Sequence, residues 1–313
     1  MENKKLTPMK FLPESQQMPW GTVEYKIADL GFVDSLSGEG WLGGNNLSDI
    51  MQTYLERVVG ETSFDWYGTQ FPVMVKRLEV KGRTSLHVNP DDETAEQRYD
   101  AFGKTAFWYV QAAGPNARLF LGFKRPVTAA EFYKACQEGN VEPLLHSVRP
   151  KPGEGFLVRP GMVHAAQDVT LIEVAEASEL WFRLFDWGAE GRELHLEEAF
   201  DLVNLGAWRK ADTLAGASVT TDQFTLHRLP LSQPLRSRRD PEDTFFLYIG
   251  LSGSAQLQAD GAVYAIAPGE VLLVPAEVDD FVLLPLSADT QLLEVRMDPR
   301  KGEEDEQPAE PLE

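Results

Sequence analysis

The sequence predicts an all-β protein made of two related β units. Short apolar segments separated by turn signals fill most of the chain, a pattern that favours a sandwich or barrel over a parallel α/β sheet. A stretch near residue 270 also repeats the pattern of one near residue 155, which indicates a duplicated β unit. Helical patterns are few and short.

Strands of the first unit are expected wherever a short apolar run lies between turn residues. A second all-β region runs from about Phe224 to Met297. The expected strands of the first unit are Phe71–Val80, Arg83–Asn89, Ala106–Ala112, Ala117–Gly122, Gly155–Arg159, Thr170–Ala175 and Leu180–Asp186.

Helices are expected where apolar residues recur at helical spacing between start and stop signals. Gly60 ends the first, Asp91 or Asp92 caps another, and Thr128 with Glu131 forms a capping box. The expected helices are Leu47–Val59, Glu93–Phe102, Thr128–Glu138 and Leu194–Leu202.

The repeat pairs the segment 153–160 with the segment 269–275, each a glycine and a short apolar strand before a proline. The second copy has no histidine where the first has His164, so any chemistry is expected in the first copy. We therefore expect an N-terminal domain over residues 1–200 that holds the site, a C-terminal domain over 201–300, and an acidic disordered tail over 301–313. The segment around Gly216 is expected to join the domains.

Composition narrows the possible partners. The 313 residues carry 49 acidic and 29 basic side chains, a formal net charge of −20, so the surface should repel nucleic acid and anionic membranes. There is one cysteine, Cys136, and neither a signal-peptide pattern nor an apolar run of membrane-spanning length. We expect a cytosolic protein with no nucleic-acid or membrane partner, and the sequence does not indicate its oligomeric state.

One constellation suggests a metal site. In a strand, alternate side chains share a face, so His87 and Asn89 should point toward the same pocket. The turn Pro160-Gly161 could bring His164 to that pocket from a neighbouring strand. Structural alternatives stay open, because a lone histidine is more often a core or surface residue and Asn before Pro favours a turn.

Several motifs together resemble the class I mannose-6-phosphate isomerases, which are bicupins, over about residues 20–297. The cupin pattern is a short strand followed by Pro-Gly-x-x-His. The matching stretches are Phe71-Pro72-Val73-Met74-Val75-Lys76, Gly103-Lys104-Thr105, Trp108-Tyr109-Val110, Gly161-Met162-Val163-His164, Leu171-Ile172-Glu173-Val174, Phe182-Arg183-Leu184-Phe185-Asp186-Trp187 and Arg192-Glu193-Leu194-His195.

The resemblance implies two jelly-roll-like cupin barrels and a zinc enzyme that interconverts mannose 6-phosphate and fructose 6-phosphate through an enediol. It puts the metal ligands at His87, Asn89, Ala106 and His164. Only His164 keeps the family's residue, and Ala106 has replaced a carboxylate. Since an anionic ligand is lost, we expect zinc or another divalent metal to bind weakly or not at all.

Other residues of the resemblance would handle the sugar phosphate. Glu173 or Lys76 is the expected base for the proton transfer, and the residues alone do not choose between them. Arg183 is expected to hold the phosphate or the enediolate, and Lys104 to bind substrate. Because the surface is acidic, these cations, with Lys124, would have to form a local positive pocket.

The same residues could instead have purely structural or surface roles. Lys76 could be a solvated edge charge, Lys104 a surface residue at a helix end, and Arg183 a structural partner of Glu173. The remaining histidines are expected to be structural; they are His146, His195 and His227.

Two functions therefore remain. The first is a mannose-6-phosphate isomerase-like enzyme acting on mannose 6-phosphate or a related phosphosugar. The second is a non-catalytic sugar or sugar-phosphate binding bicupin with a degenerate metal site. A cupin oxygenase ranks last, because Ala106 removes the carboxylate that an iron site needs.

Overall fold

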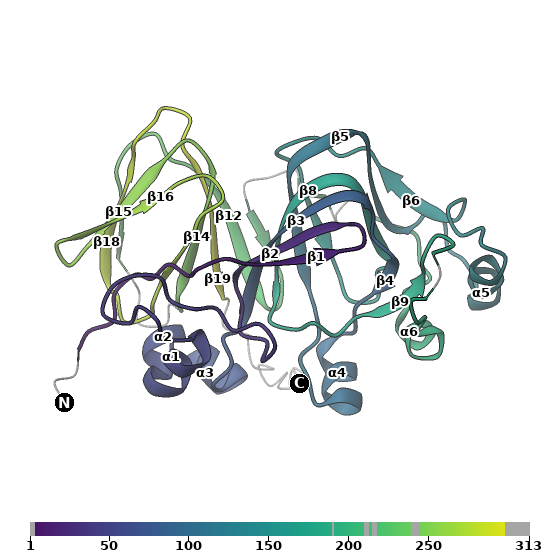
Figure 1. Cartoon of the computed structure of the whole chain (residues 1–313), viewed down its shortest axis with the longest axis horizontal. Coiled ribbons are helices and arrows are strands. Elements are labelled where there is room, and N and C mark those ends of the chain that lie inside the picture. The colour runs from purple at the N-terminus through teal and green to yellow at the C-terminus, as the bar shows by residue number, and fades with distance from the viewer. Residues whose placement is uncertain (1–3, 190, 210–212, 215–217, 239–243, 298–313) are drawn as a thin grey trace, which may run out of the picture.

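The computed structural model is predominantly β, with antiparallel sheets in two units and short helices around them (Figure 1). It describes residues 4–189, 191–209, 213–214, 218–238 and 244–297. The predicted all-β fold is confirmed. No helix within these ranges has the length and apolar character needed to cross a membrane. The expected tail over 301–313 and the joining segment around Gly216 lie outside the described residues.

The first unit is one ten-stranded sheet whose main path follows the order β1-β2-β3-β8-β5-β7-β10. The short strands β4, β6 and β9 pair off this path and help to close the sheet around its inner face. The strands are β1 (Glu14–Met18), β2 (Gly21–Ile27), β3 (Val73–Arg83), β4 (Leu86–Val88), β5 (Ala106–Phe123), β6 (Leu145–Val148), β7 (Gly155–Val158), β8 (His164–Glu176), β9 (Phe182–Phe185) and β10 (Thr213–Leu214).

Two strands expected within residues 106–122 form the single strand β5. Between the two expected ranges the register against β8 shifts, from Ala113 to Arg118, and pairing then resumes. At the irregularity the backbone N–H of Asn116 donates to the Asp168 carboxylate at 2.8 Å. The extra residues are thus absorbed in a bulge, which bends the sheet without ending the strand.

The second unit consists of two facing sheets around an apolar core. A five-stranded sheet has the order β11-β12-β19-β14-β17, and a four-stranded sheet has the order β13-β18-β15-β16. The strands are β11 (Ser218–Thr220), β12 (Phe224–Pro230), β13 (Leu235–Arg238), β14 (Phe246–Ser252), β15 (Ala255–Ala259), β16 (Ala262–Ile266), β17 (Val271–Val274), β18 (Asp280–Pro285) and β19 (Gln291–Met297).

The predicted internal repeat is present in the backbone. β7 and β17 are both four-residue, fully buried strands that follow a glycine with positive φ, Gly153 and Gly269. Each glycine N–H donates to a carbonyl of the neighbouring long strand, that of Val110 in β5 and that of Gly250 in β14. Positions 110 and 250 therefore correspond, and so do the strands that carry them.

The helices lie at the edges of the sheets. The helix expected over residues 47–59 is broken at Leu55, whose φ of 51° interrupts the helical path. The expected caps are confirmed, because Asp91 accepts from the Thr94 N–H and Thr128 from the Glu131 N–H. The helices are α1 (Leu47–Tyr54), α2 (Glu56–Val59), α3 (Glu61–Tyr67), α4 (Asp92–Tyr99), α5 (Ala129–Gln137) and α6 (Leu196–Leu202).

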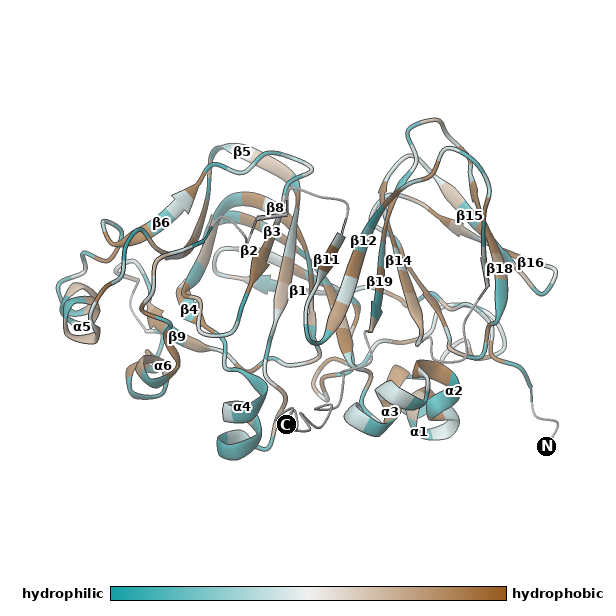
Figure 2. Cartoon of the chain, turned by 180° about the vertical axis from the view of Figure 1, so that it is seen from behind, coloured by the Kyte–Doolittle hydropathy of each residue, from teal (hydrophilic) through white to brown (hydrophobic). Residues whose placement is uncertain are grey.

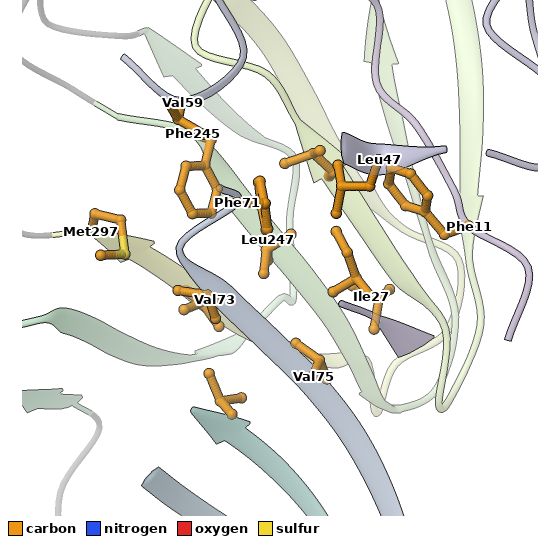
Figure 3. Close-up of a cluster of buried hydrophobic side chains, with 14 of the residues drawn as sticks. Phe11, Ile27, Leu47, Val59, Phe71, Val73, Val75, Phe245, Leu247 and Met297 are labelled. Carbon is orange, nitrogen blue, oxygen red and sulfur yellow. The ribbon is translucent and has the colours of Figure 1, made fainter. Parts of the chain in front are cut away.

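An apolar cluster joins the two units. Side chains of β3, such as Val73, meet Leu247 of β14, and the rings of Phe71 and Phe245 lie 4.8 Å apart (Figure 3). The hydropathy view shows apolar positions along these facing strands, whereas α4 is largely hydrophilic (Figure 2). Residues 4–59 also pack on the second unit, since the Ala276 N–H donates to Val58 at 2.8 Å. The domain boundary at residue 200 stays a prediction.

Candidate active site

A cavity of about 190 Å³ opens on the inner face of the first sheet. Aromatic side chains, Trp20, Tyr25, Trp108 and Trp181, form much of its wall. The predicted residues that line it are Lys76, His87, Lys104, Glu173 and Arg183, together with two residues that were not predicted, Glu179 and Arg192. Asn89 and His164 are buried next to this set rather than in the wall.

Strand register brings Lys76, Glu173 and Trp108 together. Lys76 on β3 lies directly opposite Glu173 on β8, and Glu173 lies opposite Trp108 on β5. Residues in direct register point to the same face of a sheet, here the cavity. Glu173 accepts a hydrogen bond from the Trp108 indole at 2.7 Å and pairs with the Lys76 ammonium at 2.9 Å.

Glu179, in the segment between β8 and β9, completes this charged set. Its carboxylate lies 2.6 Å from the Lys76 ammonium, so Lys76 is held between two carboxylates. Burial lowers the pKa of Lys76, but Glu173 and Glu179 outweigh burial and hold that pKa above its ordinary value. Burial raises the pKa of Glu173, but Lys76 and Lys104 outweigh it and hold the pKa well below its ordinary value. Lys76 is therefore an ammonium and Glu173 a carboxylate at neutral pH.

Lys104 lies at the edge of the same set. Its nitrogen is 3.8 Å from Glu173 and 3.9 Å from Glu179, longer than the contacts that Lys76 makes. Burial and the neighbouring Lys76 lower the pKa of Lys104. Its backbone position depends on Gly103, where a Cβ would come within 2.5 Å of the Asp91 carbonyl carbon. Both lysines are buried, so the alternatives of an edge charge and a surface residue are wrong.

The two motif histidines are cross-strand neighbours. His87 on β4 pairs with His164 at the start of β8, and their ring centres lie 4.0 Å apart in an edge-to-face arrangement. Each Nδ1 bonds a backbone carbonyl two residues earlier, Ser85 at 2.9 Å and Met162 at 2.8 Å. A carbonyl only accepts, so each Nδ1 carries the proton. Burial lowers the pKa of His87 to about 4 and that of His164 well below its ordinary value, so both rings are neutral and Nε2 is an acceptor.

Asn89 follows β4 and is 1% exposed. Its amide nitrogen donates to the Lys104 carbonyl at 3.3 Å, and its backbone carbonyl accepts from the Gly161 N–H at 2.9 Å. The Asn89 side-chain oxygen has no hydrogen-bond partner in the described part of the chain. Asn89 thus ties together the strand and turn segments that carry the other site residues.

The side chains at the expected metal position do not fit the zinc centre that the resemblance implies. Among the described residues, no three His, Cys, Asp or Glu side chains are grouped as metal ligands. With Zn–N bonds of about 2.0–2.1 Å, two imidazoles on one tetrahedral zinc hold their ring centres about 5 Å apart, farther than this pair. Ala106 puts a buried methyl group in an apolar cluster where the family has its carboxylate. These features agree with weak or absent metal binding.

Two guanidinium groups also line the cavity. Arg183 on β9 donates to the Ser85 hydroxyl at 3.3 Å and to the Glu193 carbonyl at 2.7 Å, and lies 4.9 Å from the Trp181 ring centre. Arg192 forms an ion pair with buried Asp186. The alternative of a structural pair between Arg183 and Glu173 is not realised among the described residues.

Arg192 is the cation that sequence reasoning missed, although it begins one of the matching motifs. The expected fourth cation, Lys124, instead donates to the Pro143 carbonyl and does not line the cavity. The remaining histidines have structural contacts, as expected: His195 accepts from the Arg183 N–H, His146 stacks on Trp208, and His227 bonds Arg296.

The fold and cavity together define a two-unit cupin protein with its candidate site in the first unit. The chain is 28% identical over 232 residues to GmuF, a probable mannose-6-phosphate isomerase of Bacillus subtilis (strain 168), a match covering 69% of this chain and 73% of that protein. The protein is thus related to the class I mannose-6-phosphate isomerases, which confirms the predicted resemblance. No family model matches the chain.

Solved structures share the fold. The mannose 6-phosphate isomerase of Bacillus subtilis superposes with a TM-score of 0.79 at 21% identity, covering 93% of this chain and 99% of that one. A mannose 6-phosphate isomerase bound with zinc and yttrium superposes with a TM-score of 0.75 at 15% identity, covering 94% of this chain and 100% of that one.

Proposed function

We propose that the protein is an aldose–ketose isomerase that interconverts mannose 6-phosphate and fructose 6-phosphate or acts on a related phosphosugar. The observation that carries this proposal is a buried carboxylate, Glu173, set beside two lysines in a cavity that two arginines also line. The relatives named as mannose-6-phosphate isomerases support the same reaction class.

Glu173 is the better candidate for the base. Lys76 is held as an ammonium between two carboxylates, so it has no lone pair to accept a proton. The Glu173 carboxylate takes the proton from C2 of the open-chain aldose, which leaves an enediolate across C1 and C2. The proton on O2 then passes to O1, and the same carboxyl group returns a proton to C1 as the carbonyl forms at C2, which gives the ketose.

The cations have separate tasks in this proposal. Lys76 and Lys104 stand beside Glu173, where ammonium groups stabilise the negative charge that develops on the two enediolate oxygens. Arg183 and Arg192 bind the phosphate, since a guanidinium can hold two phosphate oxygens at once. No step is assigned to a metal ion, because the donor set does not fit one.

The alternative is a non-catalytic sugar or sugar-phosphate binding bicupin. The observation in its favour is the substituted shell, in which Ala106 and Asn89 stand at the family's carboxylate and histidine positions. Binding would then use the same arginines and aromatic walls without proton transfer. The cytosolic location and the expected absence of nucleic-acid and membrane partners stay predictions.

A coupled assay for fructose 6-phosphate formation, run with chelator and with added zinc, separates the two functions. We expect turnover of mannose 6-phosphate or another aldose phosphate. Saturable binding measured by calorimetry without turnover under either condition would favour the binding protein. Absence of both would remove the proposal.

A further inference from the structure

The four expected ligand positions hold two imidazoles, an amide and a methyl group, at His87, His164, Asn89 and Ala106. Resting on the proposed function, we propose that this cavity binds and isomerises its sugar phosphate without a divalent metal ion, and that His87 binds a sugar hydroxyl through Nε2. The ligand is an open-chain aldose phosphate. The site binds the ligand's hydroxyl groups at one end and its phosphate oxygens at the other.

The histidine geometry is the first observation. The ring centres of His87 and His164 lie 4.0 Å apart, and both Nδ1–H groups donate to backbone carbonyls. Each Nε2 therefore offers a lone pair. Since His87 lines the cavity, its Nε2 can accept a hydrogen bond from a ligand hydroxyl there.

The charge balance of the cavity is the second observation. A zinc site of the implied kind needs an anionic ligand, but Ala106 supplies a methyl group. The nearby carboxylates, Glu173 and Glu179, are already engaged by Lys76 at 2.9 and 2.6 Å. An incoming dication would have to displace Lys76 from them and lie near the Lys104 ammonium. The carboxylates nearest the cavity are thus not free to replace the anionic ligand lost at Ala106.

The chemistry stays complete without the ion. Isomerisation needs a base and positive charge beside O1 and O2, and no electron is gained or lost overall. Glu173 carries the proton from C2 to C1, the hydroxyl proton of O2 passes to O1, and the two ammonium groups lie beside that carboxylate. The hydroxyl acceptor at His87 and the arginines then fix the two ends of the substrate.

The experiment measures metal content and ligand binding in parallel. Purified full-length protein is analysed for zinc by mass spectrometry after incubation with zinc and gel filtration, and mannose 6-phosphate is titrated by calorimetry in EDTA. We expect far less than one zinc per chain, and binding and turnover that EDTA leaves intact. Stoichiometric zinc, or turnover that EDTA abolishes and zinc restores, would overturn the inference while leaving the isomerase proposal standing.

Two variants sharpen the test. The triple variant His87→Gln/Asn89→His/Ala106→Glu restores the family's ligand residues and should gain zinc that the natural chain does not hold, with circular dichroism to check its fold. His87→Phe should weaken mannose 6-phosphate binding in EDTA by about tenfold, the effect of one lost hydrogen bond. Unchanged affinity in His87→Phe would overturn the role of His87. Absence of both binding and turnover in the natural chain, with or without zinc, would overturn the inference and the proposed function together.

Discussion

In the first β unit, Glu173 accepts a hydrogen bond from Trp108 and lies opposite Lys76. In the second unit, Glu294 accepts a hydrogen bond from Tyr248 and lies opposite His227. The hydrogen bonds are 2.7 and 2.8 Å long, and the carboxylates occupy equivalent strands. The duplicated fold has therefore kept a cross-strand carboxylate in both copies.

The surroundings of the two carboxylates differ. Glu173 faces a cavity lined by lysines, arginines and aromatic rings. Tyr248 is fully buried in the apolar core of the second unit, packed with Phe246 and Phe281. The pairing of the strands therefore places a carboxylate at the same position in both units. Only in the first unit do a cavity and nearby cations allow that carboxylate to meet a substrate.

The largest expected effect comes from neutralising each carboxylate in turn. Glu173→Gln should lower kcat by about 100- to 10,000-fold, because it removes the proposed general base. Glu294→Gln, the matched change in the second unit, should keep near-normal turnover. Steady-state kinetics with mannose 6-phosphate measures both. Equal losses in the two variants would mean that the units do not differ in function.

A second prediction concerns the buried ion pairs. Lys76→Met leaves Glu173 and Glu179 without their shared ammonium, and should cost about 3–5 kcal/mol of unfolding free energy. Lys10→Met removes a partly exposed pair with Glu270 and should cost less than about 1 kcal/mol. Urea denaturation compares the two variants. A similar small loss in both would show that the first unit does not depend on its charged set.

The matched hydrogen bonds give a third, smaller effect. Trp108→Phe and Tyr248→Phe each leave a carboxylate without its aromatic donor, and each should cost about 1–3 kcal/mol. Activity should fall only for Trp108→Phe, because only Glu173 meets substrate. Unfolding curves and kinetics together distinguish these outcomes, and reduced activity in Tyr248→Phe would contradict the comparison.

The last expected effect, spread over several pH units, is a pH dependence of stability from His87. Its pKa is lowered to about 4 in the fold against 6.5 ordinarily, so the unfolded chain binds more protons between these values. Stability should therefore rise with pH from 4 to 6.5, by no more than about 1.4 kcal/mol per pH unit from this one group. Urea midpoints across this window measure the slope, which His87→Phe should flatten. An unchanged slope would show that the fold does not lower the pKa of His87.

Sequence reasoning reached the fold class, the repeat and most strands because these depend on local patterns. It missed β1, whose sequence Glu-Ser-Gln-Gln-Met lacks an apolar alternation and is largely exposed, and it also missed β2 and β6. It also missed the break at Leu55, because positive φ is expected at glycine rather than at leucine. The pairing of β1 with β2 holds β1 in the sheet despite its polar sequence.

Most residues of the candidate site could be predicted from the sequence, but the contacts between them could not. Motif order indicated Lys76, Lys104, Glu173 and Arg183, yet the cross-strand register that sets Lys76 against Glu173 is not readable from one sequence. Glu179 lies between strands with no motif of its own. Arg192 had a signal, since it begins the stretch Arg192-Glu193-Leu194-His195, but only folding shows that it reaches the cavity.

Turnover of mannose 6-phosphate in deuterated water, followed by NMR in the presence of EDTA, tests the central claim most directly. The account predicts conversion to fructose 6-phosphate with deuterium entering at C1, because Glu173 exchanges its proton with solvent while the enediol exists. No conversion and no exchange, with EDTA or with zinc, would contradict an isomerase site in the first unit.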